Sequence, residues 1–131
     1  MTLLVAATAE IMCDLGDAPD TLIVEPGPPH TAVSTPTPLA VITDFAPGVN
    51  ITTFGMCNSP ANPAVIAATA AALGVFTPAP CVPATVAPWE PPAPVLLDGI
   101  PAFDELATCE CLWGGTIVVT DPGQLSVVTL P

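Results

Sequence analysis

The chain has 131 residues with no Lys or Arg, 12 Asp and Glu, and a formal net charge of −12. This charge cannot neutralise phosphates, which excludes nucleic-acid binding through basic contacts and disfavours an anionic membrane surface. Hydrophobic residues make up 51% of the chain, enough for one domain over residues 1–131. No apolar run approaches the ~20 residues of a membrane span, so stable membrane anchoring is not expected. The carboxylates serve either as a solubilising shell or as a face for a basic partner.

The first third of the chain predicts short strands separated by turns. A turn cluster is expected at Asp14–Asp20, and residues 26–38, with five prolines, predict an extended loop that contains the single histidine, His30. The predicted strands are Leu3–Ala7, Ala9–Cys13, Thr21–Glu25 and Leu39–Asp44.

One segment predicts a helix. Asn62 is a good N-cap, Pro63 suits the first helical position, and Gly74 suits a left-handed C-cap. Between them, Ala64–Leu73 is apolar on all sides, which indicates a helix packed on most sides. The other segments are then expected to wrap around it.

The second half predicts extended and hairpin segments. Pro78–Pro94 is expected to be extended, and Val95–Ile100 predicts a tight hairpin with Asp98-Gly99 as its turn. Thr116–Thr120 and Leu125–Leu130 flank Asp121-Pro122-Gly123-Gln124, which predicts a hairpin with a type II turn. Apolar residues on both faces of these two strands indicate that both faces are covered. The expected fold is therefore all-β with one short helix, built of short hairpins.

Five cysteines are candidates for metal binding: Cys13, Cys57, Cys81, Cys109 and Cys111. None forms a CxxC pair, which argues against a thioredoxin-like site and a zinc ribbon. In a strand, Cys109 and Cys111 point to the same face, and with Cys13 and either Cys57 or Cys81 they could bind zinc through four thiolates. Buried free thiols and disulfides across loops are the alternatives.

The sequence argues against an enzyme. His30 would have to serve any histidine-dependent mechanism, but it lies in the proline-rich loop. The acids are scattered rather than paired, and no glycine-rich phosphate loop is present. With no Lys or Arg, an anionic transition state has no cationic side chain to stabilise it.

A series of short motifs runs in order from about residue 5 to residue 128. In these motifs the chain resembles the PAAR-like spike-tip proteins of bacterial contractile injection systems, such as type VI secretion systems and phage tail-like particles. The motifs are Cys13-Asp14-Leu15-Gly16, Ala40–Asp44, Asn50-Ile51, Phe54-Gly55-Met56-Cys57, Ala61-Asn62-Pro63, Pro80-Cys81-Val82-Pro83, Ala87-Pro88-Trp89, Cys109–Gly115 and Asp121–Gln124.

The resemblance implies a conical domain that caps a trimeric β-helical VgrG-like spike, one copy per trimer, and sharpens it for piercing an envelope. The spike would be contacted through the last two predicted strands, at Thr116, Val118, Thr120, Leu125, Val127 and Thr129. The particle would assemble in the bacterial cytoplasm and deliver its tip outside on contraction, with attached effectors as further candidate partners.

The resemblance also bears on a metal. Classical PAAR tips bind a metal near the vertex largely through histidines; if a metal is kept here, the cysteines must supply most ligands to zinc or iron. Two other readings of the residues stay open. One is a secreted interaction module stapled by metal or disulfides, and the other is a metal-thiolate redox or hydrolytic protein that uses Cys109 and Cys111.

Overall fold

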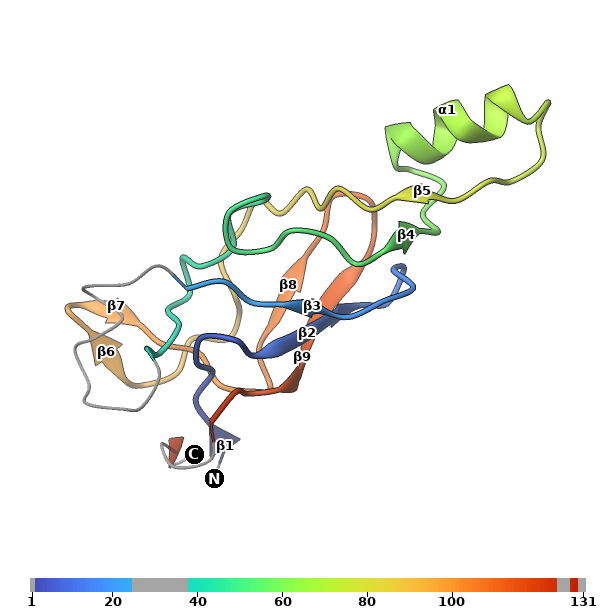
Figure 1. Cartoon of the computed structure of the whole chain (residues 1–131). Helices are drawn as coiled ribbons and strands as arrows, with labels where there is room; N and C mark the ends of the chain where they lie inside the picture. The colour runs from blue at the N-terminus through green and yellow to red at the C-terminus, as the bar shows by residue number, and fades with distance from the viewer. Residues whose placement is uncertain (1, 25–37, 125–127, 130–131) are drawn as a thin grey trace.

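A computed structural model describes residues 2–24, 38–124 and 128–129 of the chain. In these residues the protein consists of small antiparallel sheets and a single short helix (Figure 1). This confirms the predicted all-β class with one helix. His30, the proline-rich loop around it, Leu125 and Val127 lie outside the described residues.

The described elements are short. They are β1 (Thr2–Leu3), β2 (Glu10–Cys13), β3 (Asp20–Thr21), β4 (Met56–Cys57), α1 (Pro63–Ala71), β5 (Ala79–Pro80), β6 (Leu96–Leu97), β7 (Ile100–Pro101), β8 (Thr108–Glu110), β9 (Thr116–Asp121) and β10 (Val128–Thr129). They form a four-stranded sheet in the order β3-β2-β9-β8 and three two-stranded sheets, β1-β10, β4-β5 and β6-β7.

The four-stranded sheet forms the body of the molecule. Its inner face contributes Ile11, Cys109 and Ile117 to the main core, whereas Val118 on the outer face is exposed. The prediction that both faces of the β9 segment are covered is therefore wrong for this chain alone. At the centre of the core, Trp89 stacks on Phe103 with ring centroids 4.7 Å apart.

Leu39–Asp44 was predicted as a strand, but isolated bridges replace a continuous ladder. Leu39 pairs with Ala6, and Val41 pairs with Ala102. The segment then turns, because the Asp44 carboxylate accepts a hydrogen bond from the backbone N–H of Val41 (2.8 Å). Leu39 and Val41 are buried in a second, smaller core cluster with Leu4, Leu97 and Ala102.

The Asp98-Gly99 hairpin is confirmed. β6 and β7 are antiparallel neighbours in which Leu97 pairs with Ile100. Both turn residues have positive φ, 50° for Asp98 and 83° for Gly99. Two successive positive φ angles fit the type I′ turn that joins tightly twisted strands.

The predicted C-terminal hairpin is wrong. β9 pairs with β2 and β8, whereas β10 pairs with β1. The Asp-Pro-Gly turn is held by the N-terminal segment instead, because the Pro122 carbonyl accepts the Ala6 N–H (2.9 Å) and the Gln124 side chain donates to the Leu4 carbonyl (2.6 Å). The chain after β9 is thereby directed to β1.

The helix has the predicted cap but not the predicted environment. The Asn62 side chain accepts the Ala64 N–H (2.9 Å), and positive φ angles at Leu73 and Gly74 follow the helix. However, Val65 is its only buried residue. The helix does not organise the core; it projects from the body beyond β4 and β5 (Figure 1).

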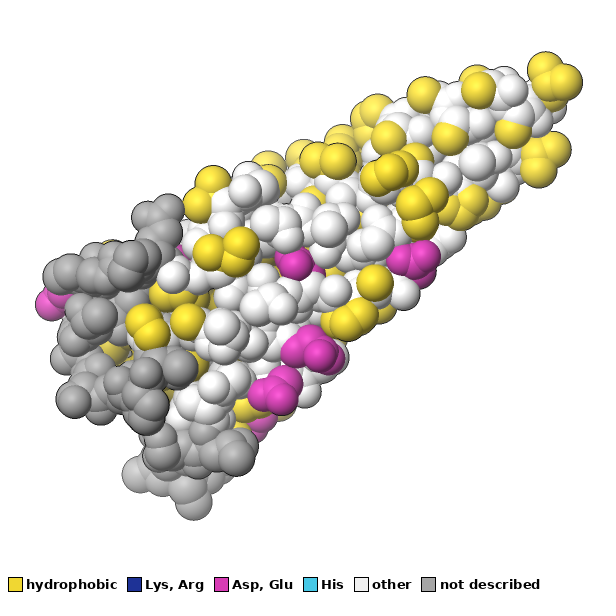
Figure 2. Space-filling view, viewed as in Figure 1, with side chains coloured by type: hydrophobic (Ala, Val, Ile, Leu, Met, Phe, Trp, Pro, Cys, Tyr) yellow, Lys and Arg dark blue, Asp and Glu magenta, His cyan; other side chains and the backbone are white. Residues whose placement is uncertain are grey.

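The molecule tapers towards this helix. The wide end contains β1, β6 and β7, and the narrow end contains α1 (Figures 1 and 2). We call residues 58–78 the distal projection, and the β4-β5 pair that joins it to the body the neck. No helix in the described residues is long and apolar enough to span a membrane.

Candidate functional site

Four of the five cysteines converge where the neck meets the body. Cys57 lies in β4, and Cys81 follows β5. The N–H of Cys81 donates to the Gly55 carbonyl (2.7 Å). Cys13 ends β2, and Gly16, three residues later, forms a bridge with Cys57. Cys111 follows β8 and forms a bridge with Thr85. We call Cys13, Cys57, Cys81 and Cys111 the four-cysteine cluster.

The thiols of this cluster lie close enough to influence one another's pKa. The pKa of Cys81 is raised to about 11, mainly by burial and to a smaller extent by charge repulsion from the nearby Cys57, Cys13 and Cys111. Burial also raises the pKa of Cys13, with additional repulsion from Cys111 and Asp14. In the absence of a cation the raised pKa values keep Cys13 and Cys81 neutral at physiological pH, and these thiols pack as small apolar groups.

Backbone donors face each sulfur of the cluster. The Ser59 N–H donates to Cys57 Sγ (3.4 Å), and the Ala84 N–H donates to Cys111 Sγ (3.5 Å). Backbone hydrogen bonds from Leu15 and Gly16 lower the pKa of Cys13, and one from Phe54 lowers that of Cys81, each opposing the larger effect of burial. Donors of this kind favour a thiolate over a thiol and orient thiolates that bind a metal.

Three glycines make the close packing around the cluster sterically feasible. A Cβ on Gly115 would come within 2.5 Å of Cys13 Sγ, and a Cβ on Gly16 would come equally close to the Cβ of Phe54. Gly55 has a φ of +75°, and a side chain there would collide with Asp17. The glycines of three quoted motifs thus act as spacers, a role that spacing alone did not predict.

Aspartates fix the loops that carry the cysteines. Asp14 accepts the Thr116 N–H (2.9 Å), which ties the end of β2 to the start of β9. Asp17 accepts the Met56 N–H (2.7 Å), which ties the same loop to the neck. These two carboxylates therefore have structural partners already and position the loops around Cys13 and Cys57.

The sequence predicts that Cys109 and Cys111 act together, but in the structure Cys109 belongs to the core. It pairs with Ile117 in the β8-β9 ladder, and its sulfur donates to the Ala87 carbonyl (3.6 Å). Burial raises its pKa to about 12, with smaller contributions from Cys111 and Glu110. β8 ends at Glu110, so the alternation that would place Cys109 and Cys111 on one face stops before Cys111.

The donor set of the cluster fits a soft metal, but its present arrangement is not a coordination sphere. Four thiolates are the ligand set of many structural zinc sites. All five cysteines are buried free thiols without disulfides. Within residues 2–24, 38–124 and 128–129, no three His, Cys, Asp or Glu side chains are placed to coordinate an ion. Inert thiols and a metal site therefore both stay open.

The predicted spike-contact residues fall into two groups. Thr116, Val118 and Thr120 alternate along the outer face of β9, from the four-cysteine cluster towards the wide end. Thr129 lies in β10, paired with Thr2 of β1. Their role in binding a spike stays a prediction.

The described fold is thus a small tapering β protein with a cysteine cluster at the base of an apolar projection. The chain belongs to the family described as "Domain of unknown function (DUF4280)", whose model matches residues 5–124. No curated protein and no solved structure matches the chain significantly.

Proposed function

We propose that this protein is the PAAR-like spike tip of a bacterial contractile injection system, seated on a trimeric β-helical VgrG-like spike. The observation that carries the proposal is the taper, from a wide end of paired strands to a narrow end of one helix (Figures 1 and 2). A cap of this shape covers the strand ends of a blunt β-helix, which are otherwise a liability for aggregation.

Contacts between distant parts of the chain favour a mechanical role. Thr52 donates its backbone N–H to Asp20 (2.8 Å) and its hydroxyl to the same carboxylate (2.9 Å). The Gln124 side chain reaches the Leu4 carbonyl across 120 positions of sequence. The chain also has 19 prolines, which limit its backbone freedom. Force on the narrow end is therefore distributed over many linked segments.

The wide end is the proposed spike-facing surface. It carries the exposed side chains of Leu96 in β6 and Leu106, whose neighbour Glu105 donates its N–H to the Leu3 carbonyl of β1. Exposed apolar residues at one end of a monomer are typical of an interface. One chain on three identical subunits must present roughly equivalent contacts to each.

The test is reconstitution with a trimeric VgrG-like spike protein, followed by native mass spectrometry. The expected product has one tip chain per spike trimer. A double substitution, Leu96→Glu with Leu106→Glu, should weaken the complex at least tenfold, because it places charge in an apolar contact. Leu73→Glu, at a still more exposed leucine of the narrow end, is the control and should leave the complex unchanged.

Absence of a complex, or three tip chains per trimer, would contradict the capping role. A wide-end double variant that binds as well as the native chain would move the contact elsewhere, with the outer face of β9 as the next surface to substitute.

A metal in the four-cysteine cluster is part of this proposal. Zinc or iron bound by Cys13, Cys57, Cys81 and Cys111 would join the neck to the ends of β2 and β8, on either side of the start of β9, and stiffen the base of the projection. The proposal is supported by the four neighbouring thiols and the backbone donors that face them.

A further inference from the structure

The charges of the protein are segregated along its length. Residues 45–89, a segment that includes the neck and the distal projection, contain no charged side chain; all 12 carboxylates lie before or after it. In Figure 2 the acidic side chains lie over the body, and the narrow end shows apolar and uncharged surface. A protein with a net charge of −12 thus ends in a region without charge.

Apolar side chains are exposed around the whole projection rather than along one stripe. Leu73 is 95% exposed, and Ile66, Val75 and Phe76 are each at least half exposed. Val65 is the only helical residue buried against the neck and body. A protein groove would cover one face of a helix, whereas exposure on all free sides fits an apolar medium that surrounds it.

The backbone of the projection is largely satisfied internally. After the helix, the N–H groups of Leu73, Gly74 and Val75 donate to the carbonyls of Ala70, Thr69 and Ala72. The Thr77 N–H donates to the Thr69 hydroxyl (3.0 Å). Pro60, Pro63 and Pro78 have no N–H to satisfy. Transfer of this segment out of water therefore leaves few unpaired donors, which is the main requirement for backbone in lipid.

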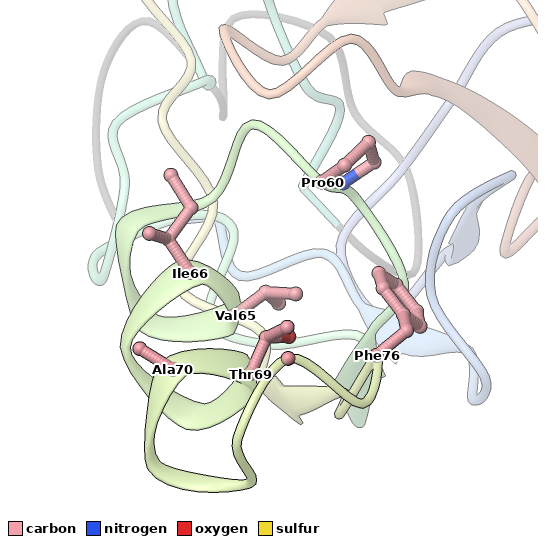
Figure 3. A pocket seen from close by; sticks show the side chains of 7 residues that line it. Pro60, Val65, Ile66, Thr69, Ala70 and Phe76 are labelled. Carbon is pink, nitrogen blue, oxygen red and sulfur yellow. The ribbon is translucent and has the colours of Figure 1, made fainter.

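A hollow of about 290 Å³ lies beside the helix, and its lining is apolar like the exposed surface of the projection. It is lined by Pro60, Val65, Ile66, Thr69, Ala70, Gly74 and Phe76. Figure 3 shows Val65 and Thr69 extending from α1 toward the side of the hollow that carries Phe76. The Thr69 hydroxyl already accepts the Thr77 N–H, so the hollow offers little to a polar ligand.

We propose that the distal projection inserts into the outer leaflet of a zwitterionic lipid bilayer. The nine-residue helix is about 14 Å long at ~1.5 Å per residue, close to the ~15 Å hydrocarbon depth of one leaflet. A zwitterionic surface is specified because the acidic body behind the projection is repelled by anionic lipids. Membrane insertion goes beyond the capping role. It rests on the proposed function in one respect, namely that the narrow end of the tip reaches the target first.

A tryptophan placed in the projection tests the insertion directly on the free full-length chain. Leu73→Trp is expected to show a blue-shifted emission with phosphatidylcholine vesicles, and at least twofold quenching when the acyl chains are brominated. Leu106→Trp, at the wide end, is the matched control and should show neither change. Trp89 and Trp113 are present in both variants, so their background cancels in the comparison.

Flotation measures the energetic contribution of the apolar side chains. Leu73→Glu with Phe76→Glu should reduce the vesicle-bound fraction at least tenfold, whereas Leu96→Glu with Leu106→Glu should not. Replacing phosphatidylcholine with phosphatidylglycerol should also reduce it. Circular dichroism of the glutamate variants checks that the fold is retained.

Three results would overturn the inference: no quenching of the Leu73→Trp variant, equal quenching of both tryptophan variants, or vesicle binding unaffected by Leu73→Glu with Phe76→Glu. Self-association without lipid that the same two substitutions abolish would instead assign the projection to a second copy of the chain. Spike binding depends on the opposite end, so failure here leaves the capping role intact, and failure of capping leaves this result intact.

Discussion

Gly115 packs so closely against Cys13 that a Cβ on Gly115 would lie 2.5 Å from the Cys13 sulfur. Gly115 also accepts the Cys111 N–H through its carbonyl (2.9 Å). One residue without a side chain thus sets the separation of two members of the four-cysteine cluster. The position needs glycine for space, since its φ is not in the left-handed region.

Gly115→Ala should therefore displace Cys13 and destabilise the fold by about 1–3 kcal/mol, the usual range for overpacking a filled site. Urea unfolding measures the loss of stability, and titration with a thiol reagent should show faster reaction of the displaced sulfur.

Gly114→Ala is the matched control. A Cβ on Gly114 meets nothing within 4 Å, but its φ is +93°. Backbone strain should lower stability by about 1–2 kcal/mol without changing thiol reactivity. Equal thiol reactivity in the two variants would contradict the spacer role of Gly115.

Zinc uptake should distinguish the cluster from Cys109. The apo protein is expected to bind one zinc per chain, and Cys81→Ser should lower the affinity at least a hundredfold, because a neutral hydroxyl is a poor substitute for a thiolate ligand. Cys109→Ser, also buried but bonded to the Ala87 carbonyl, should retain stoichiometric zinc. Elemental analysis after dialysis gives the stoichiometry.

Zinc binding should also weaken as the pH falls, since each bound thiol must lose a proton. If the native chain takes up no zinc or iron at pH 8, the cluster is a set of packing thiols and the metal part of the proposal fails.

Local signals in the sequence predicted local structure well. The cap at Asn62, the proline at the first helical position and the glycine after the helix define α1 to within two residues. The Asp98-Gly99 turn was also predicted, because two positive φ angles in succession favour this residue pair.

Signals that depend on long-range packing were misleading. An apolar helix is expected to be buried, but the sequence does not show whether it packs against its own chain or lies in another apolar environment. In the same way, the Asp-Pro-Gly turn predicts a reversal but not the partner strand, and backbone contacts from Ala6 and Leu4 direct the chain to β1. The four-cysteine cluster depends on Gly16, Gly55 and Gly115 as spacers, which no periodicity reveals.

Asn62 offers a test of whether the projection unfolds independently of the body. Its Oδ1 caps the helix, but its buried Nδ2 has no hydrogen-bond partner. Asn62→Ala should destabilise the helix by about 1 kcal/mol, because the Ala64 N–H loses its acceptor. Asn62→Ser keeps an acceptor and removes the unsatisfied amide, so it should be close to neutral.

Hydrogen exchange locates the effect of these substitutions. Asn62→Ala should speed exchange in residues 64–77 about fivefold, with little change in β2, β8 and β9. Uniformly faster exchange throughout the chain would show that the projection and the body unfold as one unit.

Alkaline pH should unfold the metal-free protein through its thiols. Burial raises the pKa of Cys81 to about 11 and that of Cys109 to about 12, from an ordinary value of 9.0. Above pH 9 the unfolded chain loses these protons while the folded chain keeps them. The unfolded state then binds fewer protons, so the free energy of unfolding falls as pH rises, by up to about 1.4 kcal/mol per pH unit for each thiol.

The composition of the chain leaves few other groups that could contribute to this pH dependence. The chain has no Tyr, Lys or Arg, so cysteines are its only side chains that titrate between pH 9 and 12. Urea unfolding at pH 8, 9, 10 and 11 should give constant stability at first and a decline above pH 9. Cys109→Ala should make the decline shallower, because one of the shifted thiols is gone, whereas Leu106→Ala, an exposed control, should leave its slope unchanged. A stability that stays flat to pH 11 would mean that the buried thiols ionise as readily in the folded state as in the unfolded chain.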